Sequence, residues 1–367
     1  MIQKLVWANV THRPLRTFLT ALLVAIPVTL VLTLTGLSKG MIEDYNGRTR
    51  GVGADIIIRP KGSTLIGLGS APIPEAIVTF VSGRPHVAMA TGIVAQTLGT
   101  PASSAAGIDL DAFNRMSGGF DYISGGPFQG ADDVIVDQYY ADEKKIHTGD
   151  LIELAFAAQK WRVSGVVKPG KLNRVFVDLR KLQDLTGNSG KVNLVYVKVD
   201  EARNIGVVID DLKSKLESYP IYSMDEFTSL ISYDSLPMLS RFTNVVVGIS
   251  IFIGFAVVCL SMYMAVLQRT REIGILKSLG ASKWYVVSTI LREAVMLAIV
   301  GTILGIGMSF ATKWALKTLA PASLPPAIDP TWWPTALAIS LVGAVLGALY
   351  PGLRAASMDP IEALSYE

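Results

Sequence analysis

Residues 165–172 come closest to a chemical signature in this chain. Their sequence, GVVKPGKL, approaches the phosphate-binding pattern G-x-x-x-x-G-K-[S/T], in which backbone amides cradle phosphates and a hydroxyl holds Mg²⁺. Leu172 replaces that hydroxyl, and Pro169 removes one backbone amide from the cradle. We therefore predict a strand followed by a Pro-Gly turn at this place, and no ATP site on this chain.

Other reactive side chains give no pattern for catalysis or metal binding. No serine lies in a G-x-S-x-G setting. The adjacent pairs Asp132–Asp133 and Asp210–Asp211 point different ways in a helix or a strand, so we expect solvated surface rather than an acid/base pair. The one cysteine, Cys259, excludes an intramolecular disulfide. The histidines, which lack metal-ligand spacing, are His12, His86 and His147. We expect a protein that is not an enzyme, with no cofactor or metal of its own.

The most distinctive pattern is the charged, amphipathic stretch QRTREIGILKSLGA at residues 268–281. Ile273, Leu276 and Leu279 recur every third residue, as on one side of a helix, and Gly280 is placed to end that helix in a left-handed conformation. Ser282 is placed to cap a second helix that runs into an apolar segment. A short exposed helix of this kind should dock on a partner, the alternative being a helix that only lies on the membrane surface.

Composition places this stretch in a membrane protein. Hydrophobic residues make up 50% of the 367 residues and charged residues only 17%, with a mean hydropathy of +0.43, whereas soluble proteins average about 25% charged residues. The net charge of +3 is too small to indicate a nucleic-acid partner. Runs of about 20 uncharged residues are candidates for membrane-spanning helices. Four such runs cover residues 18–37, 243–267, 294–312 and 332–350.

These four apolar runs carry three further signals. Pro27 should kink the first run, whose alternative reading as a cleaved signal peptide is disfavoured because no A-x-A site follows it. No Asp, Glu, Lys or Arg lies deep in a run, so the energy for any transport must come from elsewhere than an ion or proton gradient. Two G-x-x-x-G spacings suggest that the third and fourth spans pack together, although glycine is common in spans by chance. Their glycines are Gly301 and Gly305, and Gly343 and Gly347.

Basic residues in the short loops set the expected orientation. They gather in both tails and in residues 268–293, whereas the loop 313–331 holds only Lys313 and Lys317. We therefore expect both termini on the cytoplasmic side and residues 38–242 on the opposite side. The basic residues on the expected cytoplasmic side are Lys4, Arg13, Arg16, Arg269, Arg271, Lys277, Lys283, Arg292 and Arg354.

The insert between the first and second spans has the pattern of a mixed α+β domain with two subdomains. Two β-α-β units should form one subdomain, and a β-rich second one should occupy residues 99–190. The expected helices and strands of the two units are 54–59, 74–81 and 87–98, then 192–199, 202–216 and 221–223. A hairpin is expected at 151–155 and 161–167. Residues 38–50 and 225–242 should be helical stalks, the alternative being irregular linkers.

The fold expected is therefore an α-helical membrane protein with four transmembrane helices and a large mixed α+β domain between helices 1 and 2. The expected division is 1–50 for the tail, first span and stalk; 51–224 for the inserted domain; 225–267 for the stalk and second span; 268–293 for the cytoplasmic loop; 294–350 for the third and fourth spans; and 351–367 for the C-terminal tail.

Two cytoplasmic motifs resemble those of ABC transporter permeases of the MacB/FtsX/LolC type. Residues 269–281, RTREIGILKSLGA, are similar to the family's loop motif, and residues 351–364, PGLRAASMDPIEAL, to its C-terminal pattern. In that tail Asp359 should cap a helix, with Pro360 at its first position and Glu362 closing a capping box. The order of one span, a large outer domain and three spans is also similar, and the outer domain resembles the periplasmic core of the MacB-like branch.

The resemblance implies a permease subunit of the mechanotransmission type in a bacterial inner membrane, with residues 38–242 in the periplasm. Its loop helix would be the coupling helix that seats in a groove of a separate ATPase, which would hold ATP and Mg²⁺. Unlike MacB, this chain starts at the membrane. We expect two ATPase copies, a second permease copy in a homo- or heterodimer, and possible use of a periplasmic adaptor protein. The residues expected at the ATPase contact are Arg271, Glu272, Ile273, Ile275, Leu276, Leu279 and Gly280.

The activity that the resemblance implies is export or extraction of a substrate from the periplasm or the outer leaflet. Two alternatives stay open from the sequence. One is a lipoprotein-releasing permease of LolC type, and the other is an FtsX-like transmembrane signalling protein that transports nothing.

Overall fold

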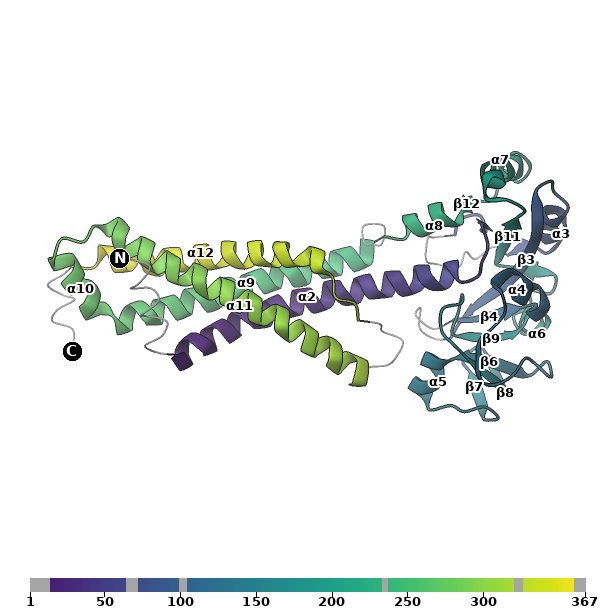
Figure 1. Cartoon of the computed structure of the whole chain (residues 1–367), viewed down its shortest axis with the longest axis horizontal. Helices are drawn as coiled ribbons and strands as arrows, with labels where there is room; N and C mark the ends of the chain where they lie inside the picture. Colours follow the sequence, from purple (N-terminus) through teal and green to yellow (C-terminus); the bar gives the residue numbers. More distant parts are fainter. Residues whose placement is uncertain (1–13, 64–71, 99–103, 233–236, 320–325, 360–367) are drawn as a thin grey trace. The chain divides into compact units, whose positions relative to one another are not determined.

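The computed structural model describes residues 14–63, 72–98, 104–232, 237–319 and 326–359 (Figure 1). The chain forms two compact units. The first, here called the helical unit, comprises residues 1–40, 237–320 and 326–367, and the second, called the α/β unit, comprises residues 41–236 and 321–325. The division falls inside the two segments that were expected to be stalks.

Four helices in the described part of the chain are long and apolar enough to cross a membrane. They contain the four predicted runs and extend beyond them: α2 (Pro14–Arg50), α9 (Pro237–Gln268), α11 (Lys283–Leu319) and α12 (Trp333–Ser357). Pro27 lies inside α2, which continues to Arg50 as the first stalk was expected to do. The second stalk consists of two helices, α8 (Met224–Leu230) and the first residues of α9, and α9 begins at Pro237, where a proline was expected to break the helix.

The glycines of the spans make close contacts, but not the expected ones. Helices α11 and α12 pack along each other, with Gly352 Cα facing the side chain of Ile290. A Cβ atom at Gly305, however, would lie 2.7 Å from Val28 Cγ1 of α2, and Thr29 of the same helix donates a hydrogen bond to the Gly305 carbonyl over 3.1 Å. A Cβ at Gly347 would lie 2.8 Å from the Phe255 carbonyl oxygen of α9.

Gly301 and Gly343, the first glycines of the two G-x-x-x-G motifs, face the same helices as Gly305 and Gly347. A Cβ at Gly301 would lie 2.7 Å from Val24 Cγ1 of α2, and one at Gly343 would lie 3.9 Å from the Phe255 amide of α9. The first motif therefore brings α11 against α2, and the second brings α12 against α9. The sequence gives the presence of close-packing faces but not the identity of the helix that each one meets.

The α/β unit is built on one long sheet and a small two-stranded one. The long sheet has the order β12-β1-β11-β3-β4-β9-β6-β8-β5, with β7 paired to β8, and β2 pairs with β10 in the small sheet. The strands are β1 (Ile56–Ile58), β2 (Ile73–Pro74), β3 (Val87–Thr97), β4 (Ser104–Ile108), β5 (Tyr122–Gly125), β6 (Asp133–Asp137), β7 (Leu151–Leu154), β8 (Ala157–Val167), β9 (Val175–Asp178), β10 (Lys191–Val192), β11 (Leu194–Val199) and β12 (Ile221–Ser223).

Strand β3 joins the two groups of strands that the sequence suggested. Its first part pairs with β11 and its last four residues, Val94–Thr97, pair with β4. The two β-α-β units are present as β1, α3 (Ala76–Ser82) and β3, and as β11, α7 (Ile205–Lys215) and β12, and β1 lies between β11 and β12. A 3-10 turn at Ala202–Asn204 precedes α7. The hairpin β7–β8 also forms, with Leu154 opposite Ala157.

Residues 104–190 contain the strands β4 to β9, as expected of a β-rich subdomain, and also three short helices that were not expected. The three helices are α4 (Leu110–Ser117), α5 (Gln138–Lys144) and α6 (Leu179–Leu185). Each follows an aspartate at the end of a strand or turn, whose carboxylate accepts a hydrogen bond from a backbone amide of the first helical turn. These caps are Asp109, Asp137 and Asp178. The sequence contains this signal, because an aspartate directly precedes each of the three helices.

The segment that approaches a P-loop has a structural role. It is the end of β8 followed by a turn in which Gly170 has φ 120°. Lys171 Nζ donates to the carbonyls of Ser117 and Gly119, where α4 ends, over 2.8 Å to Ser117. Burial lowers the pKa of this lysine, and its ammonium lies 5.7 Å from the centre of the Phe120 ring. The lysine therefore holds a helix end, not a phosphate.

The expectation of solvated aspartate pairs fails at one position. Asp133 is buried and accepts two hydrogen bonds from the Arg162 guanidinium, at 2.8 and 3.0 Å. It also accepts backbone hydrogen bonds from Gln129 and Gly130, and together these contacts hold the pKa of its carboxyl below the usual value although burial raises it. The alternation of residues along a strand does not show that Asp133 is buried with a partner. Arg162 lies opposite Asp133 on the neighbouring strand β8 but is 29 residues away in the sequence.

A buried ion cluster joins the last turns of α2 to this sheet. The Arg174 side chain is 3% exposed and contacts Asp137 at 3.2 Å and Asp44 at 3.3 Å. Asp44 also accepts from Arg48 on α2, whose carbonyl accepts from the Leu172 amide over 2.8 Å. Charge is therefore balanced inside the cluster, as a buried ion needs. Within the α/β unit, the end of α2 is fixed to the segment that leads into β9.

A first prediction concerns the glycine contact between α11 and α2. Gly305→Val should destabilise the helical unit, because its side chain has no room beside Val28, whereas Gly307→Val should be tolerated since nothing lies within 4 Å of a Cβ there. We expect a loss of about 1–3 kcal/mol for the first variant, the usual cost of overpacking. Thermal unfolding of both variants in detergent measures the difference, and equal stability would contradict the assigned contact.

A second prediction concerns the Arg174 cluster. Burial raises the pKa of Asp137 to about 6, opposed by the Tyr140 amide and by Arg174. Arg174→Met should lower the unfolding free energy at neutral pH by about 3–5 kcal/mol, since Asp137 is then left as a buried charge without this partner. A raised folded-state pKa means that the folded protein binds the proton more tightly, and removal of Arg174 takes away a group that lowers this pKa. The stability of the variant should therefore return as the pH falls from neutral toward 4.

The control for this cluster is an exposed arginine. Arg180, which contacts Glu75 at 2.6 Å, is 67% exposed, so Arg180→Met should cost about 1 kcal/mol or less. Urea unfolding followed by the fluorescence of buried Trp161 reports on the α/β unit. Equal stabilities of the two variants, or an Arg174→Met variant whose stability does not rise on acidification, would refute a buried charge pair at this place.

Candidate functional site

The loop between α9 and α11 contains a short helix, α10 (Thr270–Ser278). Arg269 leaves the helical conformation at φ −118° and separates α10 from α9. After Leu279, Gly280 has φ 91°, the left-handed conformation that glycine adopts without strain and that ends helices. Ser282 Oγ then accepts a hydrogen bond from the Tyr285 amide over 3.2 Å and caps α11. The predicted terminating glycine and serine cap are both confirmed.

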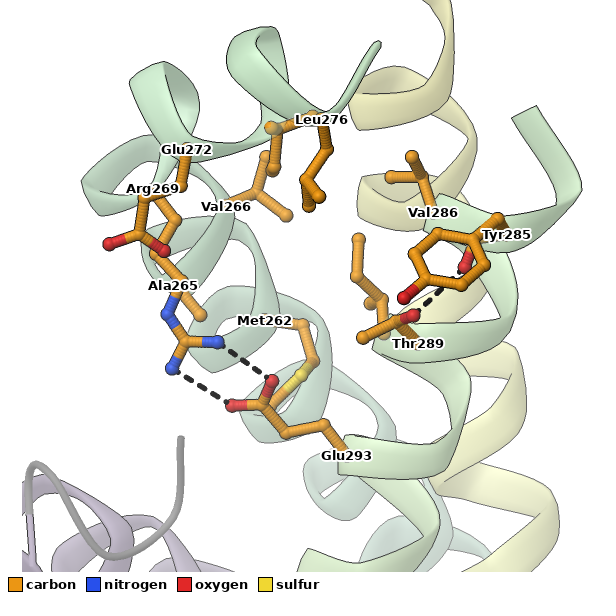
Figure 2. A pocket seen from close by; sticks show the side chains of 12 residues that line it. Met262, Ala265, Val266, Arg269, Glu272, Leu276, Tyr285, Val286, Thr289 and Glu293 are labelled. Carbon is orange, nitrogen blue, oxygen red and sulfur yellow. Dashed lines mark hydrogen bonds and ion pairs between the residues drawn. The ribbon is translucent and has the colours of Figure 1, made fainter. Parts of the chain in front are cut away.

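An ion pair fixes the start of this loop to α11 (Figure 2). Arg269 Nη1 lies 3.0 Å from Glu293 Oε2, and its second amino group lies 3.4 Å from Oε1. The two side chains are only 17% and 7% exposed. Two parallel hydrogen bonds from one guanidinium also fix the orientation of the side chains. The sequence placed Glu293 at the end of a loop, whereas α11 begins at Lys283 and Glu293 lies three turns inside it.

A lysine fixes the other end of α10. Lys277 Nζ donates to the carbonyl of Ala356 over 3.0 Å and to the carbonyl of Met358. These carbonyls belong to the last turn of α12, where a helix leaves acceptors without an internal partner and carries partial negative charge. Helix α10 is thus tied to α11 through Arg269 and to the end of α12 through Lys277.

A largely apolar pocket lies beneath α10, between α9 and α11 (Figure 2). Its empty volume is about 610 Å³, with the open mouth included. Met262 and Val266 of α9, Ile273 and Leu276 of α10, and Val286 of α11 contribute to its wall. The Arg269–Glu293 pair lies at one side of it, as Figure 2 shows. Ile273 and Leu276 therefore face the inside of the loop.

The opposite side of the loop exposes large apolar side chains. Leu279 is 81% exposed, Trp284 72% and Ile275 45%. They come from the end of α10, the turn after it and the start of α11. Arg271 is also exposed, as is Glu272, whose side chain lies at the edge of the pocket (Figure 2). A loop that is tied at both ends and exposes leucine and tryptophan is a candidate surface for contact with a partner or with the membrane surface.

The structure divides the seven residues expected at a partner contact into two groups. Arg271, Glu272, Ile275, Leu279 and Gly280 are exposed, whereas Ile273 is buried and Leu276 is half-buried in the pocket wall. Sequence reasoning missed the anchoring roles of Arg269 and Lys277 and the exposed Trp284. One feature of the sequence could have indicated the pairing of Arg269 with Glu293: Glu293 is a single acidic residue directly before the apolar run 294–312. Of the predicted C-terminal cap, Asp359 is described and exposed, and Pro360 and Glu362 lie outside the described residues.

Two protein-family models match this chain. The MacB-like periplasmic core domain matches residues 17–215, and the FtsX-like permease C-terminal domain matches residues 244–360. The first match alone covers more than half of the 367 residues. The loop described above lies inside the second match.

Curated relatives agree with the two models. The chain is 28% identical over 246 residues to the uncharacterized ABC transporter permease YknZ of Bacillus subtilis, a match that covers 64% of this chain and 61% of YknZ. It is 24% identical over 392 aligned positions to the macrolide export ATP-binding/permease protein MacB of Escherichia coli, covering 98% of this chain and 60% of MacB. The chain thus spans about three fifths of the length of these relatives.

Among solved structures, the extracellular domain of the ABC-type transporter YknZ from Gram-positive bacteria aligns with 46% of this chain and 98% of its own length, at 17% identity and a TM-score of 0.36. On the family models and the curated relatives, this chain belongs to the ABC transporter permeases of the MacB/FtsX type, with a MacB-like periplasmic core domain and an FtsX-like C-terminal permease domain.

Proposed function

We propose that this permease couples ATP hydrolysis by a separate ATPase subunit to a conformational change of its α/β unit, and that α10 is the helix on which the ATPase docks. The observation that carries the proposal is the exposed apolar group Ile275, Leu279 and Trp284 on a loop that is anchored at both ends. Exposed apolar side chains of this size, flanked by charges, are the usual anchors of a protein interface.

The anchors of α10 give this docking a mechanical consequence. A displacement of α10 by the ATPase would act on α11 through the Arg269–Glu293 pair and on α12 through Lys277. Helix α11 packs against α2 at Gly301 and Gly305, and α2 continues to Arg50 as one helix. Because packed helices and paired charges resist deformation, a chain of such contacts supports transmission of movement rather than passage of a substrate through the bundle.

We place both termini and α10 in the cytoplasm of a bacterial cell, the helical unit in the inner membrane, and the α/β unit in the periplasm. The supporting observation is the concentration of Lys and Arg in the tails and in the α10 loop. The complex would contain a second permease copy and two ATPase subunits, because four spans form half of such a transporter. Its work would be export or extraction of a substrate from the periplasmic side, with or without an adaptor protein.

The docking surface makes a direct prediction. A double variant, Ile275→Asp with Leu279→Asp, should abolish co-purification of the ATPase, because both side chains are exposed and a buried carboxylate at an interface costs several kcal/mol. Thermal unfolding of the permease should stay unchanged, since neither side chain packs into its core. Quantitative pull-down of the ATPase from solubilised native membranes measures the loss.

Two comparison variants sharpen this test. Leu151→Asp changes an equally exposed leucine of the α/β unit and should leave the ATPase bound. Leu276→Asp changes a pocket-lining residue and should lower thermal stability as well as ATPase binding. Retention of the ATPase at wild-type level by the Ile275/Leu279 double variant would remove α10 as the docking site.

The ion pair beneath α10 makes a second prediction. Arg269→Met leaves Glu293 buried without this partner, and Glu293→Leu does the reverse, so each should cost about 3–5 kcal/mol of stability and weaken ATPase binding. The Arg269→Met/Glu293→Leu variant should recover most of the stability, because apolar side chains of similar size can replace a buried pair. Thermal unfolding of the four proteins forms the cycle, and additive losses would mean that the two residues act independently.

A further inference from the structure

An arginine and two tyrosines meet where α9 and α12 approach their ends, at the same end of the helical unit as α10. Arg354 lies in the last turn of α12, Tyr350 lies one turn before it, and Tyr263 belongs to α9. The Cζ atom of Arg354 lies 5.4 Å from the centre of the Tyr263 ring, and its Nη1 lies 3.5 Å from the Tyr350 hydroxyl oxygen. Arg354 and Tyr350 are both exposed. These three residues are called the Arg354 group below.

The charge of Arg354 is not paired with a carboxylate of any residue that the structure describes. Two other cations at this end are paired, because Arg269 binds Glu293 and Lys277 binds backbone carbonyls of α12. The long contact with Tyr350 is the only hydrogen bond of the Arg354 side chain to a described residue. A guanidinium that lies over a ring keeps the N–H donors at its edge available. Arg354 can therefore bind an anion in the plane of its guanidinium.

The lengths of two helices place Arg354 at the depth of lipid headgroups, given the membrane placement proposed above. Arg354 follows Trp333, the first residue of α12, by 21 residues, or about 32 Å of helix. On α11, the exposed residues Arg292 and Trp314 are 22 residues apart, or about 33 Å. The hydrocarbon layer is about 30 Å thick, and tryptophan and basic residues gather at its borders. Arg354 and Arg292 thus lie at the border on the side of α10.

The surface beside the Arg354 group is aliphatic on the side of the membrane interior. Leu346 precedes Tyr350 by one turn of α12, and Leu260 precedes Tyr263 by about one turn of α9. Both leucines are exposed. The order of an unpaired cation, a phenolic hydroxyl and exposed leucines matches a phosphate group with hydrocarbon chains attached to it.

The same depth separates Arg354 from the surface proposed for the ATPase. Trp284 precedes Arg292 on α11 by eight residues, so it lies about 12 Å farther from the hydrocarbon layer. A protein that docks on α10 and Trp284 therefore meets the permease beyond the headgroups, whereas Arg354 lies among them.

We propose that the Arg354 group binds the phosphate of an anionic phospholipid, such as phosphatidylglycerol, in the leaflet on the side of α10. The guanidinium donates two hydrogen bonds to phosphate oxygens, and the Tyr350 hydroxyl donates a third. The Tyr263 ring holds the guanidinium in place by a cation–π contact. The acyl chains lie along the exposed leucines. This inference rests on the membrane placement proposed above and not on the ATPase contact.

Native mass spectrometry of the full-length protein in dodecyl maltoside measures this binding. Dioleoyl phosphatidylglycerol should bind about fivefold more tightly than dioleoyl phosphatidylcholine, the effect of one basic residue at an anionic surface. Glycerol phosphate, which has the anion but no acyl chain, should not displace the lipid at the concentrations that fill the site. Equal affinities for the two lipids would overturn the proposal, and displacement by glycerol phosphate would mean a site for a free phosphate instead.

Matched variants decide whether Arg354 is the binding residue. Arg354→Gln should lower the affinity for phosphatidylglycerol about tenfold, the usual loss when a charged hydrogen-bond partner is removed. Arg354→Lys keeps the charge but loses the two-pronged contact, so its affinity should be intermediate. Arg292→Gln changes an exposed arginine at the same depth and should leave the affinity unchanged. An unchanged affinity in Arg354→Gln, or an equal loss in Arg292→Gln, would refute a specific site.

Pull-down of the ATPase with the same proteins separates this site from the docking surface. Arg354→Gln should retain the ATPase at wild-type level, and the Ile275→Asp/Leu279→Asp double variant should still bind phosphatidylglycerol as the wild type does. The lipid site and the docking surface can therefore fail independently. An Arg354→Gln variant that loses the ATPase and keeps its lipid affinity would assign Arg354 to the ATPase contact and overturn the proposal.

Discussion

The arrangement of the loop between α9 and α11 depends on the buried pair between Arg269 and Glu293. A guanidinium and a carboxylate removed from water are tolerable only as partners, so the end of α9 is held to one place on α11. Once that place is fixed, α10 must cross between the two helices, and Lys277 meets the free carbonyls at the end of α12. The apolar side chains that remain, Leu279 and Trp284 above all, are largely exposed in the part of the chain that the structure describes.

The same device occurs in the α/β unit, at the last turns of α2. There Arg174 is surrounded by two aspartates, one from the sheet and one from the helix. In both places an arginine side chain pairs with a carboxylate of another element of the fold. The pair fixes the angle at which a helix meets its neighbour. Hydrophobic burial holds each unit together, but apolar contacts alone leave such an angle poorly specified.

Much of this could be predicted from the sequence, because the strongest signals are local. Apolar runs predicted the four long helices, and Gly280 and Ser282 predicted where α10 ends and α11 begins. Alternation predicted the strand β11, and the strand β1 and the β7–β8 hairpin were also predicted from the sequence. The short helices α4, α5 and α6 were missed, although each begins at an aspartate cap, because none is longer than eight residues and a helical period needs a longer window.

The contacts between distant residues could not be predicted in the same way. Gly301 and Gly305 indicated a close-packed face, but nothing local says that α2 rather than α12 covers it. Asp133 was expected in water because a single sequence does not show that Arg162 lies opposite. The spacing suggested that Ile273, Leu276 and Leu279 share one face, yet Leu279 follows the last residue of α10 and is exposed while Ile273 is buried.

The central claim is that the exposed face of α10 is the surface where an ATPase meets this permease. The most direct measurement is site-specific photocrosslinking in native membranes, with benzoylphenylalanine in place of Leu279 and, for comparison, in place of Leu151. The account predicts an adduct from position 279 whose tryptic peptides belong to an ATP-binding subunit, and none with that subunit from position 151. An ATPase adduct at neither position, or only lipid adducts at position 279, would contradict it.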